Sequence, residues 1–188
     1  MRGLRDHNRY GTSSDITMNI TAEEIIAKTQ RAFAGVQLGS GVSLLEAEVI
    51  DAYGSDKERA AARALDELCE WKKIPDEKLA RYYGFSFMDA EGMRFHLPAY
   101  MCFAVRKADD ADLPDSIEFF MNELDNDACK NELFVLLNKE QAEMVGQFLE
   151  FLAWNEASAS AGIGIDGSLV PDKHLTRVAR RWREFYCS

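Results

Sequence analysis

Residues 85–101 read FSFMDAEGMRFHLPAYM, and this stretch decides the fold that the sequence predicts. Apolar and polar residues alternate on both sides of the turn-forming sequence DAEG, which is typical of a β-hairpin. Pro98 has no backbone N–H and suits the first turn of a helix, so we expect a helix to leave the hairpin there. The predicted fold class is α+β, mainly α: a single-domain helical bundle with one small β-hairpin near residues 85–97.

Alternation along the hairpin also predicts which of its side chains are buried, because successive residues of a strand face opposite sides. The side chains expected to face the core are Phe85, Phe87, Phe95 and Leu97. Those expected to face solvent are Ser86, Arg94 and His96, with Asp89 and Glu91 at the turn. The stretch is therefore expected to serve mainly as scaffold.

Helices are expected elsewhere, because a Ser, Thr or Asn followed three residues later by Glu or Gln is typical of a helix start. Such pairs occur at Thr21/Glu24, Ser43/Glu46, Ser55/Glu58 and Asn138/Gln141. Gly54 is expected to end the helix after Ser43. Ala61, Ala64, Leu65, Leu68 and Trp71 are assigned to the buried face of the next helix, and the apolar helix after Asn138 to the centre of the core.

The length of 188 residues fits one domain, with 47% apolar residues to form its core. Residues 1–17 lack hydrophobic periodicity and are expected to be disordered or vector-derived, which leaves 18–188 as a single globular domain. Apolar runs are too short to span a membrane, and the N-terminus lacks the apolar region of a signal peptide. The four cysteines are widely spaced, as in reduced proteins. The sequence predicts a cytoplasmic protein.

The net charge of −10 limits the classes of partner that the chain is expected to bind. An acidic surface repels nucleic-acid phosphates and anionic membranes, so both are disfavoured, although Arg177, Arg180, Arg181 and Arg183 form a local basic face. Acidic residues gather between 109 and 127, and a basic protein partner would be attracted there. The predicted partner-binding residues are Asp109, Asp110, Asp112 and Asp115. A homo-oligomer is also compatible with the sequence.

Few residue patterns in the sequence indicate a catalytic, metal or cofactor site. The three histidines lie in distant segments, and GIGIDG (162–167) lacks the preceding strand and following helix of a dinucleotide site, so no metal or cofactor is expected. A patch at the predicted turn remains: Asp89 or Glu91 as a general base, Arg94 as an anion-binding group, and His96. These four are the candidate catalytic residues.

A family resemblance rests on several segments of the chain. FMDAEGMRFHLPAYM (87–101), GVSLLEAEVIDAYGS (41–55), WKKIP (71–75), LLNKEQ (136–141), Arg59 and Arg63 together resemble an uncharacterised bacterial family, a domain of unknown function. The likeness covers residues 32–152, and His96 stands where this family leads us to expect a tyrosine. The resemblance implies a compact cytoplasmic bacterial protein and supplies no catalytic residues.

Two functional hypotheses follow from the sequence. The first is a non-enzymatic cytoplasmic protein-binding module with an acidic surface, of an antidote-like or regulatory kind, motivated by the charge and by the scarcity of catalytic patterns. The alternative is a small enzyme that uses the carboxylates at the 89–94 turn, which requires a concave pocket there.

Overall fold

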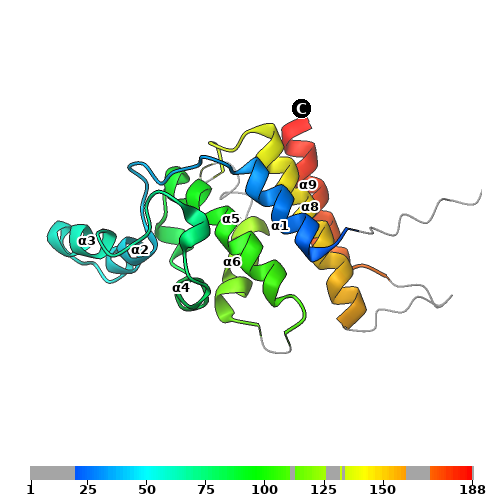
Figure 1. Ribbon diagram of the computed structural model, residues 1–188, viewed down its shortest axis with the longest axis horizontal. Helices are drawn as coiled ribbons and strands as arrows, with labels where there is room; N and C mark the ends of the chain where they lie inside the picture. Colours follow the sequence, from blue (N-terminus) through cyan, green and yellow to red (C-terminus); the bar gives the residue numbers. More distant parts are fainter. Residues whose placement is uncertain (1–19, 111–112, 126–131, 133, 160–169, 188) are drawn as a thin grey trace, which may run out of the picture.

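The computed structural model describes residues 20–110, 113–125, 132, 134–159 and 170–187, and every regular element in these ranges is helical (Figure 1). The α-helices are α1 (Ala22–Ala32), α2 (Leu44–Asp51), α3 (Asp56–Arg63), α4 (Asp76–Arg81), α5 (Ala90–Lys107), α6 (Asp115–Asp125), α8 (Lys139–Ala159) and α9 (Lys173–Cys187). Two short 3₁₀ helices, η1 (Trp71–Lys73) and η2 (Phe85–Phe87), complete the order.

The predicted β-hairpin is wrong, and with it the α+β class, because residues 85–87 form η2 and residues 90–97 belong to α5. The Asp89 side chain accepts a hydrogen bond from the backbone N–H of Gly92 at 2.7 Å, so DAEG forms the N-cap and first turn of α5 instead of a hairpin turn. Pro98 lies inside α5 and not at its start. The Arg94 carbonyl consequently lacks the helical N–H donor that residue 98 would supply.

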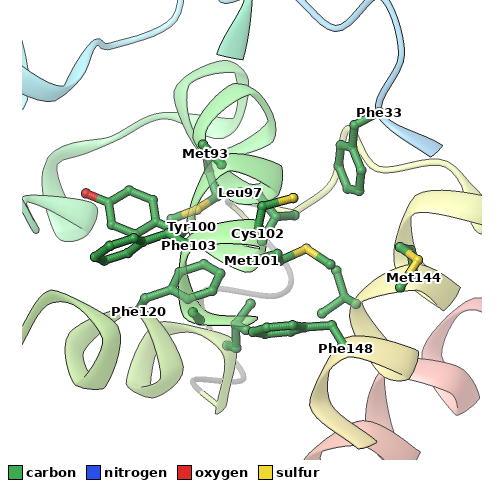
Figure 2. Close-up of a cluster of buried hydrophobic side chains, with 14 of the residues drawn as sticks. Phe33, Met93, Leu97, Tyr100, Met101, Cys102, Phe103, Phe120, Met144 and Phe148 are labelled. Carbon is green, nitrogen blue, oxygen red and sulfur yellow. The ribbon is translucent and has the colours of Figure 1, made fainter. Parts of the chain in front are cut away.

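Helix α5 occupies the centre of the fold, the position that the sequence analysis assigned to the helix after Asn138. All of its residues from Gly92 to Val105 are buried except Arg94, which is partly buried, and it packs against α1, α4, α6 and α8. A helix that is apolar on all sides must lie inside the molecule. Figure 2 shows its side chains meeting aromatic rings of α6 and α8, with the Tyr100 and Phe120 rings 5.5 Å apart.

Helices α8 and α9 pack together along their length, and α1 lies against α8 (Figure 1). The Trp182 indole is buried and donates a hydrogen bond to the Leu124 carbonyl at 3.1 Å, which ties α9 to α6. The Gln141 side chain of α8 donates to the Ala32 carbonyl of α1 at 3.2 Å. Helices α1 and α8 thus cover one side of α5, and α9 packs on α8.

Helices α2 and α3 form a hairpin that projects from the other end of the molecule (Figure 1). No residue of α3 is buried, and Ala61, Ala64 and Leu65 face solvent, with Leu65 74% exposed. The assignment of these three residues to a buried face is wrong, whereas Trp71 is buried as expected and Leu68 is partly buried, both beyond the end of α3. The α2–α3 hairpin (residues 44–65) therefore exposes Ala61, Ala64 and Leu65, which the sequence pattern had assigned to the core.

The turn of this hairpin is a Schellman motif, a helix end closed by a residue in the left-handed conformation. The N–H of Gly54 donates to the Val49 carbonyl at 2.8 Å, and the N–H of Tyr53 donates to the Ile50 carbonyl at 3.0 Å. The left-handed residue is Tyr53 (φ 57°) and not Gly54, as the sequence had suggested. The Tyr53 side chain is 97% exposed.

The structure does not test three expectations from the sequence. The predictions for residues 1–17 and for GIGIDG fall outside the described residues. The assignment of 18–188 to one domain stays a prediction. Within the described part of the chain, none of the helices combines the length and the apolar character that a membrane crossing requires.

Candidate functional site

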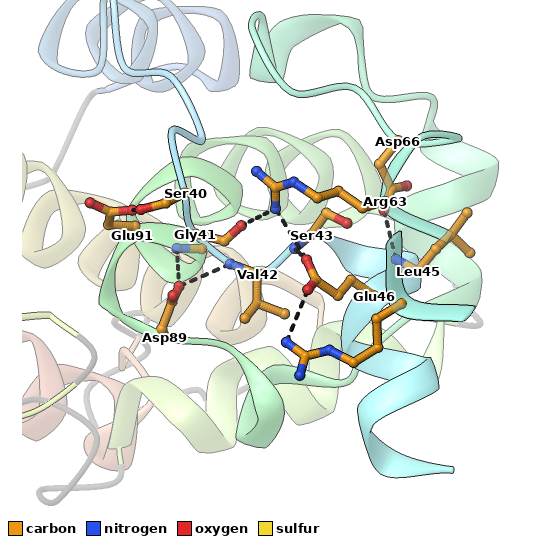
Figure 3. A network of polar contacts seen from close by, with 12 residues as sticks. Ser40, Gly41, Val42, Ser43, Leu45, Glu46, Arg63, Asp66, Asp89 and Glu91 are labelled. Atoms are coloured by element: carbon orange, nitrogen blue, oxygen red, sulfur yellow. Dashed lines mark hydrogen bonds and ion pairs between the residues drawn. The ribbon is translucent and has the colours of Figure 1, made fainter. Parts of the chain in front are cut away.

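Two of the predicted catalytic residues, Asp89 and Glu91, lie at the N-terminus of α5, where it meets the loop before α2 (Figure 3). Asp89 Oδ1 accepts the backbone N–H groups of Gly92 at 2.7 Å and of Val42 at 3.0 Å. Glu91 Oε2 accepts the Ser40 hydroxyl at 2.6 Å. Both carboxylates therefore fasten the 39–43 loop to α5.

Two glycines allow the loop and the helix to touch. A Cβ on Gly41 would lie 2.6 Å from the Glu91 Cβ, and a Cβ on Gly92 would overlap the Val42 carbonyl oxygen. Such short distances essentially never occur, so only glycine fits at either position without a backbone shift. The backbones of the loop and of α5 are in direct contact here.

A second cluster fixes the same loop from the side of α3. Glu46 is almost buried, with 11% of its side chain exposed, and its two carboxylate oxygens lie 3.1 Å from Arg59 Nη2 and 3.1 Å from Arg63 Nη1. Arg63 also donates to the backbone carbonyls of Gly39, at 2.7 Å, and Gly41. Figure 3 shows Arg63 reaching towards Glu46 and the loop.

His96 lies behind this cluster, inside the molecule, and its predicted outward position is wrong. Its side chain is 1% exposed, and Nδ1 lies 2.7 Å from the Gly92 carbonyl oxygen, which can only accept, so Nδ1–H is the donor. Burial lowers the pKa of His96 to about 4, against the weaker raising effects of the Gly92 hydrogen bond and of Asp66 and Asp89. The imidazole is neutral at pH 7.

Asp66 and Lys78 form a further pair that the sequence analysis missed. Asp66 is only 2% exposed; its Oδ1 lies 2.6 Å from Lys78 Nζ, and its Oδ2 accepts the backbone N–H of Leu45 at 2.8 Å. The Leu45 N–H belongs to the first turn of α2, so the pair anchors the start of that helix. In the sequence, only the charge pattern of residues 58–78 indicates this ion pair. That pattern is also typical of a solvent-exposed face, so it does not predict a buried pair.

Arg94 differs from its neighbours. It is partly buried, and its Nε has no hydrogen-bond partner among the described atoms. The cavities described below are lined by other residues. No cluster of three or more potential metal ligands occurs in the described ranges. The structure thus places Asp89 and Glu91 together against the 39–43 loop and His96 inside the molecule, and no described contact joins Arg94 to them. The catalytic role predicted for these residues stays a prediction.

The predicted partner-binding residues are dispersed around the C-terminal end of α5. Asp109 accepts a hydrogen bond from the Asn155 side chain at 3.3 Å, and Asp110 pairs with Lys107 at 2.8 Å. Asp115 is exposed at the start of α6, and Asp112 falls outside the described residues. Their role in binding is not tested by this geometry.

The contacts around α5 join segments that are distant in sequence: 39–46, 59–66 and 89–96. All of them lie within residues 21–180, which match the model of a family of unknown function, DUF6714. The chain belongs to this family. The DUF6714 match extends from the capping residue of α1 into α9 and assigns no activity. No match was found among curated proteins or among solved structures.

Proposed function

We propose that this DUF6714 member is a non-enzymatic protein-binding module of the bacterial cytoplasm, and that its α2–α3 hairpin contacts a basic partner protein. The observation that carries the proposal is Tyr53: a large aromatic side chain, 97% exposed, held in the left-handed conformation, which is sterically unfavourable for a bulky residue. A strained and exposed aromatic residue points to a binding function, because aromatic side chains often contribute most of the binding energy of an interface.

The surroundings of Tyr53 support a basic partner. Asp51, Asp56 and Glu58 are exposed on the same hairpin, with Lys57 as the exposed basic residue among them. Leu65 adds a second large apolar side chain to this surface. An apolar contact ringed by acidic groups is complementary to a basic protein surface, and the net charge of −10 would speed the encounter.

The carboxylates of the candidate site support a module without catalysis. Asp89 and Glu91 hold the 39–43 loop on α5, and Glu46 holds Arg59 and Arg63. Carboxylates that already accept structural hydrogen bonds are less well placed to exchange protons with a substrate. The cluster instead gives the α2–α3 hairpin a fixed base, which lowers the entropic cost of binding.

The thiols fit a reducing compartment. Cys69 and Cys102 are unpaired, and burial raises the pKa of the Cys102 thiol to about 11, so that it packs as an apolar side chain. Both observations agree with the cytoplasmic location that the proposal includes.

The test is affinity capture from a bacterial lysate at low ionic strength, with the wild-type chain and two double variants. Tyr53→Ala/Leu65→Ser removes the apolar contact of the hairpin. Val135→Ser/Leu136→Ser is the matched control, because Val135 and Leu136 are also exposed, at 64% and 40%, before α8. We expect a basic protein that binds the wild type and the control but not the hairpin variant.

Salt gives the second criterion. Binding between opposite charges weakens as screening shortens the range of the interaction, so raising the salt from about 50 to about 300 mM should lower the affinity at least tenfold. A captured protein that binds the hairpin variant as well as the wild type would overturn the proposal, as would recovery of the chain alone. If only the chain itself is recovered, light scattering shows whether it self-associates. Self-association would make the partner a second copy of this chain.

A further inference from the structure

A cavity with a mostly apolar lining lies on another side of the molecule, between α5, α6, α8 and α9. Its volume is about 290 Å³. The walls are provided by side chains of all four helices, among them Ala104, Ile117, Leu152 and Leu175. These four are each less than a tenth exposed, so they form a preformed apolar floor.

The mouth of this cavity is acidic. Asp115 and Glu118 line it, three residues apart and thus on one face of the first turn of α6, and both are exposed. Among the described residues, no Lys, Arg or His lines the cavity, and neither carboxylate has an ion-pair partner. The helix dipole places about half a unit of positive charge at the N-terminus of α6, which offsets only part of the charge of the two carboxylates. A net negative potential therefore remains at the opening.

Asn155 supplies a fixed polar group in the wall. Its Nδ2 donates to the Ala108 carbonyl at 3.0 Å and to Asp109 Oδ1 at 3.3 Å, so the donors of its amide are already used. The amide oxygen is left as an acceptor. The lining thus offers acceptors and negative charge to a ligand, which suits a donor such as an ammonium group.

We propose that this cavity binds a small apolar molecule that ends in a single cationic group, of the arylalkylamine or alkylamine class. The apolar part would occupy the floor and the ammonium group would lie at Asp115 and Glu118. At about 30 Å³ for each small group, the volume accepts about ten non-hydrogen atoms. This site is independent of the hairpin surface proposed above.

Two other cavities fit this ligand less well. The space between α1 and α8 is wider, at about 600 Å³, but is lined by Lys28, Arg31 and Lys139 as well as by glutamates. Lysine and arginine side chains repel an ammonium group. The space beside Cys102 measures about 50 Å³, which is too small for the ligand.

The experiment titrates the ¹⁵N-labelled full chain with three probes of one shape: 4-phenylbutylamine, 4-phenylbutan-1-ol and 4-phenylbutyrate. We expect the amine to bind most tightly, with a dissociation constant between about 10 µM and 1 mM, and the carboxylate most weakly. The largest amide shifts should occur at Ala104, Ala108 and Ile117 and at the side-chain amide of Asn155. Absence of amine binding at about 5 mM would overturn the proposal.

Variants separate the charge from the cavity. Asp115→Asn/Glu118→Gln should weaken the amine at least tenfold and leave the alcohol unchanged. The control Glu140→Gln/Glu143→Gln removes the same charge from the cavity between α1 and α8, and should leave the amine unaffected. Ala108→Phe, at the partly exposed C-cap of α5, should block all three probes. Equal affinity for the amine in both double variants would overturn the assignment.

Discussion

The Asp89 carboxylate accepts a hydrogen bond from the backbone N–H of Val42, 47 residues earlier in the chain, at 3.0 Å. The same oxygen caps α5 through Gly92. One side chain therefore starts the central helix and attaches to it the loop that carries the α2–α3 hairpin. Its position in the structure is explained without any chemistry on a substrate.

Asp89→Ala should destabilise the protein by about 2 kcal/mol, because it removes the helix cap and leaves the Val42 N–H without its acceptor. Asp89→Asn keeps an acceptor oxygen and should cost less than about 1 kcal/mol. Denaturant unfolding at neutral pH measures both. If the alanine variant is as stable as the wild type, the cap does not act as described.

Gly92→Ala should destabilise the protein by more than about 2 kcal/mol, since the new methyl group overlaps the Val42 carbonyl and the backbones must separate. Helix propensity alone predicts the opposite sign, a gain of about 1 kcal/mol. The matched control is Gly146→Ala in α8, where the nearest atom, at 3.1 Å, is in the flexible side chain of Arg183. That variant should be neutral or stabilising in thermal melts. Equal effects at the two glycines would contradict the close contact.

His96 should make the protein less stable in mild acid. Its pKa is about 4 in the folded state and about 6.5 in the unfolded state, so the unfolded chain binds the proton more readily between these values. Stability is therefore full above pH 6.5 and is lost as the pH falls towards 4. The expected loss between about pH 7 and pH 5 is about 2 kcal/mol.

Denaturant unfolding of wild-type and His96→Gln chains at several pH values isolates this contribution. The glutamine amide can donate to the Gly92 carbonyl but does not titrate. The variant should lose about 2 kcal/mol less than the wild type over the same interval, because the carboxylates titrate alike in both. Parallel stability curves would show that the imidazole is accessible to protons in the folded state.

Tyr53→Gly should stabilise the protein by about 0.5–1 kcal/mol while it abolishes binding of the proposed partner. Glycine adopts the left-handed conformation without the steric cost that tyrosine carries. Tyr53→Ala keeps that cost and removes the ring, so it should lose binding with no gain in stability. Thermal melts and the capture assay measure the two effects. A glycine variant no more stable than the alanine variant would remove strain as an argument for function.

Local rules predicted the helix starts well. Thr21 with Glu24, Ser55 with Glu58, and Asn138 with Gln141 form the expected reciprocal hydrogen bonds at the starts of α1, α3 and α8. These predictions are confirmed because each cap is decided within four residues. They also required no knowledge of the rest of the fold.

The errors arose where distant segments meet. DAEG suits both a turn and a helix start, and the choice was decided by Val42, which supplies a second donor to Asp89. His96 is accommodated inside because the Gly92 carbonyl accepts its N–H. Leu65 is exposed because α3 packs mainly on α2 and leaves its other faces to solvent. Periodicity along one segment contains none of this information.

The backbone contact between Gly41 and Gly92 has a consequence for mutational scans of this family. Neither position can be rescued by repacking side chains, so both should be among the least tolerant of substitution, together with Asp89. Such intolerance usually invites the inference of an enzyme centre. The close backbone contact is enough to produce it here, and abundance of the folded protein, measured in parallel, would distinguish the two origins.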